Sequence, residues 1–141
     1  MKLVVDANIL ISAMIKRSKT LELLFDDAFD LFVPEYLFEE IENHLGYISK
    51  KSGLSKNELT LLFDSLKLQL TIVPSEEFRS YLKEAAKISP DIKDIPYLAL
   101  CKKLNVALWS NDKALKEQIE IKVLSTKEII GYLIELKHSK Y

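Results

Sequence analysis

The chain has 141 residues, of which 48% are hydrophobic and only 3 are Gly and 4 are Pro. This length and composition suit one globular domain, residues 1–141, with a core of its own. The 20 basic and 21 acidic residues leave a net charge of -1, which excludes a uniformly basic nucleic-acid coat protein. The N-terminus carries an acid by its sixth residue, and no apolar run approaches the roughly 18 residues of a membrane span. We therefore expect a cytoplasmic protein with no membrane contact.

The single cysteine, Cys101, can form no disulfide within the chain. It falls in an apolar helical pattern beside Leu100 and Leu104. Neither His44 nor His138 is near it in the sequence, so a nucleophilic role is not favoured. We expect a core side chain in a reducing compartment.

Two short apolar runs separated by helical patterns occupy the first part of the chain. Residues 2–5 predict a buried strand that ends abruptly at an acid, and residues 9–25 carry two helical patterns. Residues 31–33 predict a second strand, and Pro34 stands where a proline favours the first position of a helix. We expect the glycine-containing segment 46–54, which follows that helix, to be the weakest joint of the chain.

The rest of the chain continues the alternation. Ser55 and Ser125 each precede a glutamate by three residues, the capping-box pattern that opens a helix. In chain order, the predicted elements are a helix at 55–66, a strand at 70–73, a helix at 75–85, a helix at 90–104, a strand at 106–109, a short helix at 110–115, a strand at 121–124 and a helix at 125–136. Helices thus separate all the short strands.

This alternation predicts the fold class. Parallel strands need crossover connections, and amphipathic helices supply them. We therefore predict an α/β fold with a parallel β-sheet flanked by helices on both faces, and a helical hairpin between the second and third strands. No repeat, low-complexity tract or linker divides the chain.

Two aspartates follow predicted strands. Asp6 ends the first strand, and Asp112 follows the 106–109 strand after Ser110 and Asn111. Ligands of parallel α/β sheets bind beyond the carboxyl ends of the strands. Both aspartates should therefore face one crevice if their strands are neighbours.

Two further pairs of acids are ambiguous. Asp91 and Asp94 stand at a predicted helix start, where a carboxylate can simply cap backbone amides; the position of Asp94 just ahead of the unit that ends at Asp112 favours a further role. Helical spacing places Glu40 on the border of a buried stripe and Glu39 further toward solvent, although solvation of the helix would account for both.

A cluster of carboxylates requires a cation, because like charges a few ångströms apart repel. Mg²⁺ and Mn²⁺ prefer oxygen ligands, and the chain has no cysteine–histidine set for zinc. These ions activate water and contact phosphate oxygens, which is the chemistry of phosphodiester hydrolysis. No glycine-rich phosphate loop is present, so the phosphate is expected to belong to a polymer.

Four segments together resemble the PIN-domain ribonucleases, a family that includes the toxins of many toxin–antitoxin pairs. The segments, which occur in the order of the family's motifs, are Leu3–Ser12, Pro34–Ile41, Lys93–Ala99 and Trp109–Leu115. Each fragment alone is a weak signal, but four in the right order at the right elements are specific. The resemblance covers nearly the whole chain.

Carried over position by position, the resemblance assigns metal ligation and catalysis to Asp6, Glu40, Asp94 and Asp112. It implies that Asn8 and Ser110 support the acids by hydrogen bonds, that Asp91 is either a further ligand or only a helix cap, and that Glu39 is the fallback for Glu40. It also implies cleavage of RNA by metal-activated water with Mg²⁺ or Mn²⁺, homodimers and, for a toxin, an antitoxin protein partner.

Local basic clusters are candidates for contact with an RNA backbone. Lys16, Arg17 and Lys19 place three charges within four residues after the first acid's helix, and Lys113 follows Asp112. Such clusters are more often a solvated face.

Two other interpretations stay open. A PIN-like domain can bind RNA or a protein partner without cutting, and such a domain would keep its affinity when an acid is removed. A phosphorelay receiver domain is the remote alternative, but the 70–73 strand ends at Pro74 and Ser75 instead of a phosphoacceptor aspartate, and the helical hairpin is unaccounted for.

Overall fold

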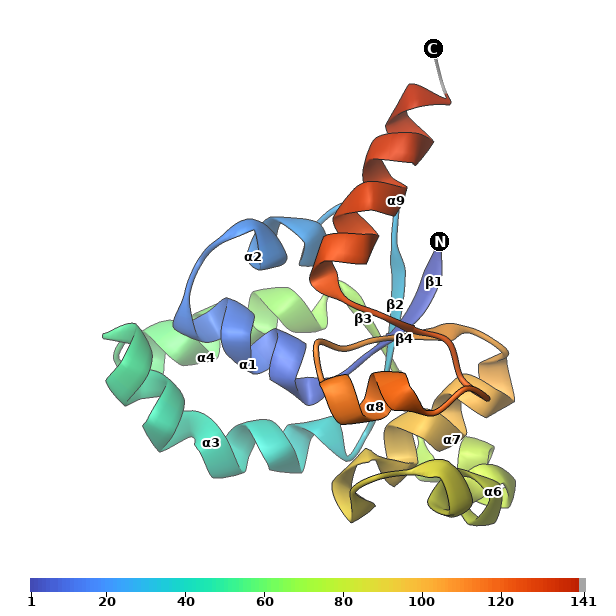
Figure 1. Ribbon diagram of the computed structural model, residues 1–141. Helices are drawn as coiled ribbons and strands as arrows, with labels where there is room; N and C mark the ends of the chain where they lie inside the picture. Colours follow the sequence, from blue (N-terminus) through green and yellow to red (C-terminus); the bar gives the residue numbers. More distant parts are fainter. Residues whose placement is uncertain (140–141) are drawn as a thin grey trace.

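A five-stranded parallel sheet forms the centre of the computed structural model, which describes residues 1–139 (Figure 1). The strands are β1 (Lys2–Val5), β2 (Asp30–Pro34), β3 (Leu70–Val73), β4 (Ala107–Trp109) and β5 (Val123–Leu124). Their order is β3-β2-β1-β4-β5, and every neighbouring pair is parallel. The strand from the N-terminus therefore lies in the middle of the sheet.

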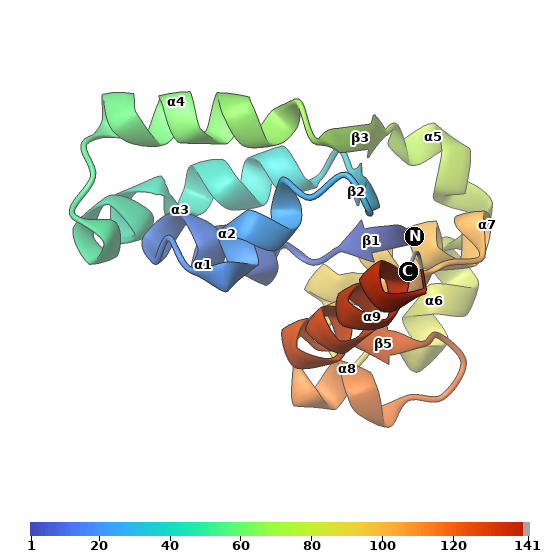
Figure 2. The same ribbon diagram turned by 90° about the horizontal axis from the view of Figure 1, so that it is seen from above.

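Helices make each connection between these strands. The helical elements, including two 3₁₀ turns, are α1 (Ala7–Ile15), α2 (Lys19–Leu24), α3 (Leu37–Ser52), α4 (Lys56–Lys67), α5 (Ser75–Phe78), η1 (Arg79–Tyr81), α6 (Leu82–Ile88), η2 (Ile92–Asp94), α7 (Ile95–Leu104), α8 (Lys113–Glu117) and α9 (Thr126–His138). Figures 1 and 2 show α1 to α4 on one side of the strands and α5 to α7 on the other. The predicted α/β class, the flanking of both faces and the hairpin of α3 and α4 are confirmed.

The core is built around β1 and α7. Leu3, Val4 and Val5 are fully buried, as expected for a central parallel strand covered on both faces. The run Tyr97–Cys101 is also buried, so this part of α7 is enclosed on all sides, where it contacts β1, β2 and β4. Burial raises the pKa of the Cys101 thiol, which agrees with a core role for this side chain. No helix within residues 1–139 has the length and apolar character needed to cross a membrane.

The prediction that Pro34 starts a helix was wrong. Pro34 is the last residue of β2, where it lies opposite Val73 of β3, and α3 begins at Leu37. The pairing of β2 with β1 ends two residues earlier, at Phe32. The missing amide proton of the proline is therefore not needed on that side, and the strand can continue to this residue.

The glycine-containing segment 46–54 is mostly helical, which also differs from the prediction. Helix α3 continues through Gly46 to Ser52 and stops at Gly53, whose φ of 75° is left-handed. Ile48 is fully buried and keeps the second half of the helix on the core. A glycine within a helix costs only about 1 kcal/mol, which packing of a buried side chain can outweigh.

Smaller differences concern the ends of elements. The helix expected at 75–85 is divided into α5, the turn η1 and α6, and the helix expected from 90 starts as η2 before α7. The strand expected at 121–124 contains only Val123 and Leu124. There the Gln118 side chain bonds the backbone N–H and C=O of Ile121, so that segment is held as a turn.

Candidate active site

The pairing of β1 with β4 brings Asp6 next to Ser110. Val5 lies opposite Trp109 in the sheet, and the Asp6 amide donates to the Trp109 carbonyl at 3.0 Å. The next residue after β4, Ser110, donates from Oγ to Asp6 Oδ2 at 2.7 Å. Two segments 104 residues apart in sequence thus meet at the carboxyl end of the sheet.

Asp6 is 4% exposed and starts α1. Its Oδ1 accepts a long bond of 3.4 Å from the Asn8 amide. Burial raises the pKa of Asp6 above its usual range, and the charge of Asp112 adds to this, whereas the bonds from Ser110 and Asn8 oppose it. Asn8 therefore acts here through its backbone.

Asp112 is tied to the same serine. Ser110 Oγ accepts from the Asp112 amide at 3.1 Å while it donates to Asp6. Asp112 Oδ1 in turn accepts from the Ala114 amide at 2.8 Å and caps α8. Both aspartates are accordingly fixed by one buried hydroxyl.

Glu40 approaches from the first turns of α3. It is partly buried, and its Oε1 accepts a bond of 2.6 Å from the hydroxyl of Tyr97 on α7. Burial raises the pKa of Glu40, the Tyr97 hydroxyl opposes that rise, and the charge of Asp6 adds to it. Glu40 is therefore close enough to Asp6 for their charges to interact.

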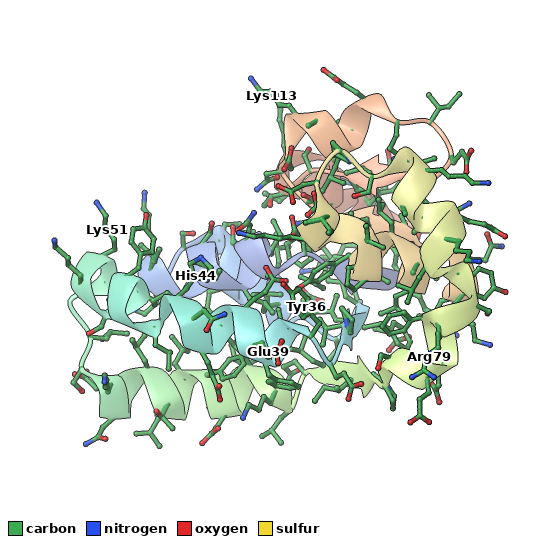
Figure 3. The ribbon with its side chains drawn as sticks, turned by 90° about the horizontal axis from the view of Figure 1, so that it is seen from below. Tyr36, Glu39, His44, Lys51, Arg79 and Lys113 are labelled. Carbon is green, nitrogen blue, oxygen red and sulfur yellow. The ribbon has the colours of Figure 1, made fainter. Side chains whose placement is uncertain are left out.

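Glu39 is directed elsewhere. Its side chain is exposed and, with Tyr36, lines a largely apolar groove of about 610 Å³ that also includes Ile72 and Phe78 (Figure 3). The geometry therefore separates the two adjacent glutamates, and Glu40 is the one that faces the aspartates.

Asp94 and Asp91 differ in the same way. Asp91 accepts from the Lys93 amide at 3.0 Å, which is the capping bond of a helix start. Asp94 precedes α7 but makes no capping bond with its side chain. Capping thus accounts for the conformation of Asp91 and not for that of Asp94.

The electrostatics of Asp94 show that the acids form one cluster. Burial raises the pKa of Asp94 to about 7, and the charges of four other acids contribute, in decreasing order Asp6, Asp112, Asp91 and Glu40. The structure therefore brings the four sequence-predicted acids within electrostatic reach of one another.

These carboxylates fit a hard divalent cation. No group of three or more His, Cys, Asp or Glu side chains in residues 1–139 is arranged to hold an ion directly. Mg²⁺, however, is usually bound by one or two carboxylates and keeps several of its waters. A cation in this cluster would offset the like charges of the acids that surround Asp94. Asp6, Glu40, Asp94 and Asp112 therefore suit Mg²⁺ or Mn²⁺ held partly through water.

The expected RNA-contacting residues belong to two parts of the chain, the end of α1 with the residues after it and the start of α8. Lys16 is the C-cap of α1, the helix that Asp6 begins, so about 2.8 helical turns separate it from Asp6. Arg17 donates to the Met14 carbonyl at 3.5 Å, and Lys19 pairs with Glu22 at 3.4 Å. Lys113 is exposed and directly follows Asp112.

The structure also contains a set of hydrogen bonds near the site that the sequence did not indicate: they join the residues that follow β4 to the start of α9. Asn111 accepts from the Thr126 amide at 2.8 Å through Oδ1 and donates to Thr126 Oγ1 at 3.1 Å through Nδ2. Trp109 Nε1 donates to the same hydroxyl at 3.0 Å. These bonds fasten the loop that carries Ser110 and Asp112 to the start of α9. No local sequence signal identifies these bonds, because their partners are 15 to 17 residues apart.

The family model described as PIN domain matches residues 4–133. The chain belongs to the PIN-domain family. PIN-domain proteins are nucleases that generally use divalent metal ions, so the receiver-domain alternative is wrong.

Two solved structures share this fold at low sequence identity. A chain of the crystal structure of VapBC2 from Rickettsia felis, bound to a DNA fragment from their promoter, superposes with a TM-score of 0.69 at 18% identity, covering 89% of this chain and 98% of that one. The crystal structure of PAE2754 from Pyrobaculum aerophilum gives 0.70 at 12% identity, covering 96% of this chain and 90% of that one. No functionally curated protein matches the sequence.

Proposed function

We propose that this PIN-domain protein is a metal-dependent ribonuclease that hydrolyses RNA phosphodiester bonds, with Asp6, Glu40, Asp94 and Asp112 as its catalytic carboxylates. The observation that carries the proposal is the grouping of the acids around Asp94: burial raises the pKa of this side chain, and the charges of the three other acids and of Asp91 add to the rise. Ligands of parallel sheets bind at the carboxyl ends of the strands. Negative side chains gathered there can bind a divalent cation, which in turn would contact the phosphate group of the substrate.

The chain's own residues would bind and orient the reactants. Ser110 holds Asp6 and the start of the Asp112 loop in a fixed relation, so two carboxylates meet the substrate from neighbouring strands. Asp94 lies at the N-cap of α7, and Glu40 lies in the first turns of α3. When bound, Mg²⁺ or Mn²⁺ would supply an activated water and neutralise phosphate charge. Lys16, Arg17, Lys19 and Lys113 are the proposed contacts to the RNA backbone.

The test is cleavage of end-labelled single-stranded and structured RNA, with single-stranded DNA alongside, in Mg²⁺, Mn²⁺ or EDTA. We expect cleavage of RNA that EDTA abolishes and that Asp6→Asn and Asp112→Asn reduce by more than about a hundredfold. Asp64→Asn is the matched control, because Asp64 is exposed on α4 and pairs only with Lys67 in residues 1–139. It should cut as wild type does.

Two outcomes would contradict the proposal. If no RNA is cut under either metal while RNA is still bound, the non-catalytic binding domain replaces the enzyme. If Asp6→Asn and Asp112→Asn cut as fast as Asp64→Asn, the activity belongs to another site or to a contaminant.

We further propose that the biological role of this ribonuclease is that of the toxin in a toxin–antitoxin pair. It is supported by the fold shared with a chain of the VapBC2 structure. Induced expression of wild type in a bacterial host should arrest growth, and Asp6→Asn should not. Unimpaired growth with an enzyme that cuts RNA in vitro would leave the nuclease standing and favour a housekeeping role without an antitoxin.

The proposed homodimer has its own measurement. Light scattering after size exclusion should give twice the chain mass of 16.2 kDa. A mass equal to one chain at micromolar concentration would contradict the dimer and leave the catalytic proposal untouched.

A further inference from the structure

Tyr97 carries a hydroxyl group in an otherwise apolar stretch of the core. The side chain is 1% exposed and is followed on α7 by Leu98, Ala99 and Leu100, which are fully buried. Its hydroxyl donates to Glu40 Oε1 at 2.6 Å, across 57 residues of sequence. A phenylalanine would fill nearly the same space, so packing alone does not explain the hydroxyl.

The position of Tyr97 links two acids of the site. Asp94 is the N-cap of α7, and Tyr97 lies about one helical turn further along, so the start of this helix carries both Asp94 and the hydroxyl that bonds Glu40. A glutamate side chain has several rotatable bonds and loses conformational freedom when it is fixed. The bond from Tyr97 selects one conformation of Glu40 before any ligand arrives.

We propose that Tyr97 is a positioning residue that holds the Glu40 carboxylate in register with Asp94 for cation binding. This inference rests on the proposed function and assigns a role to a side chain outside the carboxylate set. Tyr97 acts only through Glu40 and contacts neither substrate nor cation. A carboxylate accepts several partners, so the bond at Oε1 leaves Glu40 able to face a cation as well.

The test compares Tyr97→Phe with Tyr132→Phe. Tyr132 lies on α9, and its hydroxyl accepts from Lys122 Nζ at 3.1 Å, so the control also deletes one hydroxyl and one hydrogen bond. The readouts are the Mn²⁺ dissociation constant, measured by electron paramagnetic resonance without RNA, and kcat and KM for RNA. We expect Tyr97→Phe to weaken Mn²⁺ binding by about 10- to 100-fold and to lower kcat more than it raises KM, because loss of an outer partner of a metal ligand has effects of this size. Tyr132→Phe should match wild type.

A structural role would give a different pattern. If the Tyr97 hydroxyl serves only the stability of the fold, Tyr97→Phe lowers the thermal midpoint in EDTA but leaves the Mn²⁺ dissociation constant unchanged, which overturns the proposal. Glu40→Asp keeps the charge but withdraws the carboxylate from the hydroxyl, so it should reproduce the loss of Mn²⁺ affinity even if Tyr97→Phe folds poorly. Wild-type affinity in Glu40→Asp would equally overturn the proposal.

A double-mutant comparison shows whether Tyr97 acts through Glu40. Tyr97→Phe should add no further loss of Mn²⁺ affinity in a Glu40→Gln background, and an additive loss would refute the positioning role. Wild type that binds no Mn²⁺ would defeat the proposed function together with this inference, whereas a wild type that binds Mn²⁺ no better than Tyr97→Phe defeats the inference alone.

Discussion

Ser110 connects two candidate ligands through a single side chain. Its hydroxyl is buried, donates to Asp6 Oδ2 and accepts from the Asp112 amide. A serine at this place therefore satisfies a carboxylate that has almost no access to water. Alanine would leave both the Asp6 oxygen and the Asp112 amide without this partner.

We predict that Ser110→Ala lowers the free energy of unfolding by about 1–3 kcal/mol in EDTA, since a buried polar group loses its partner. Urea denaturation followed by circular dichroism measures it. Ser65→Ala is the control, because the Ser65 hydroxyl is exposed on α4 and bonds only the Leu61 carbonyl in the described chain, so a change within about 0.5 kcal/mol is expected. Equal stabilities of the two variants would show that the Ser110 bonds contribute nothing net.

Asp94 gives the folded protein a characteristic dependence on pH. Its pKa is about 7 in the fold against 3.8 for an ordinary aspartate. Between these values the folded state binds more protons than the unfolded state, so the associated stability is complete below 3.8 and is lost as the pH rises through 7.

We therefore predict that Asp94→Asn becomes increasingly more stable than wild type as the pH is raised from about 5 to about 8 in EDTA. An asparagine is neutral throughout, so the difference between the two unfolding curves isolates Asp94 from the other acids. Thermal midpoints at several pH values measure this difference. A difference that shrinks with increasing pH would mean that Asp94 is not subject to the repulsion described.

Some residues of the candidate site could be predicted individually from the sequence. Asp6 and Asp112 follow strands, and that position alone put them at the ligand-binding edge. Glu40 could be distinguished from Glu39 by helical phase, and the structure places them as that phase suggested. The role of Tyr97 could not be predicted, because a tyrosine in an apolar helix has no local feature that reveals a partner on another helix.

At the scale of elements, one glycine lies inside α3 and another ends it, and the two have opposite conformational roles. Gly46 lies within the helix, and a Cβ built on it meets no atom within 4 Å. Gly53 ends the helix with φ 75°, a conformation that other L-residues adopt only with strain.

We predict that Gly46→Ala raises the free energy of unfolding by about 1 kcal/mol, because alanine favours the helix, and that Gly53→Ala lowers it by about 1 kcal/mol or more. Each variant serves as the control for the other, since both add one methyl group to the same helix. Urea denaturation in EDTA compares them. Changes of the same sign would contradict the helix end observed at Gly53.

The accuracy of the secondary structure predicted from the sequence differs between elements. The strands at 2–5 and 70–73 were predicted to the residue, because short apolar runs flanked by polar residues have no competing pattern. Pro34 was wrongly predicted to start a helix, because the pairing of β2 with β3 outweighs the preference of proline for that position. Gly46 was wrongly predicted to lie in a weak joint, because the burial of Ile48 outweighs the low helix propensity of glycine. Tertiary contacts of that kind are not visible in a window of neighbouring residues.

For the whole molecule, the cluster of acids joins elements from both sides of the sheet. Asp94 precedes α7, and Glu40 belongs to α3. Asp6 and Asp112 follow the paired strands β1 and β4. A cation held by these residues would therefore connect much of the fold and should stabilise it as a unit.

We predict that Mn²⁺ at a hundredfold excess over its dissociation constant raises the free energy of unfolding of wild type by about 2.7 kcal/mol. Removal with EDTA should reverse the effect, and Asp6→Asn should largely lose it, whereas Asp64→Asn should keep it. Differential scanning calorimetry with and without metal measures the change. Stabilisation that is equal in Asp6→Asn would place the ion elsewhere on the chain.

The central position of β1 also determines when activity can arise during synthesis. The strand that leaves the ribosome first is completed on one side by β2, but its other neighbour, β4, belongs to the last third of the chain. The hydrogen bond between Ser110 and Asp6 spans 104 residues and cannot form until that strand has emerged. A chain that ends before residue 112 therefore lacks one of the four acids, so the cluster around Asp6 can be completed only late in synthesis.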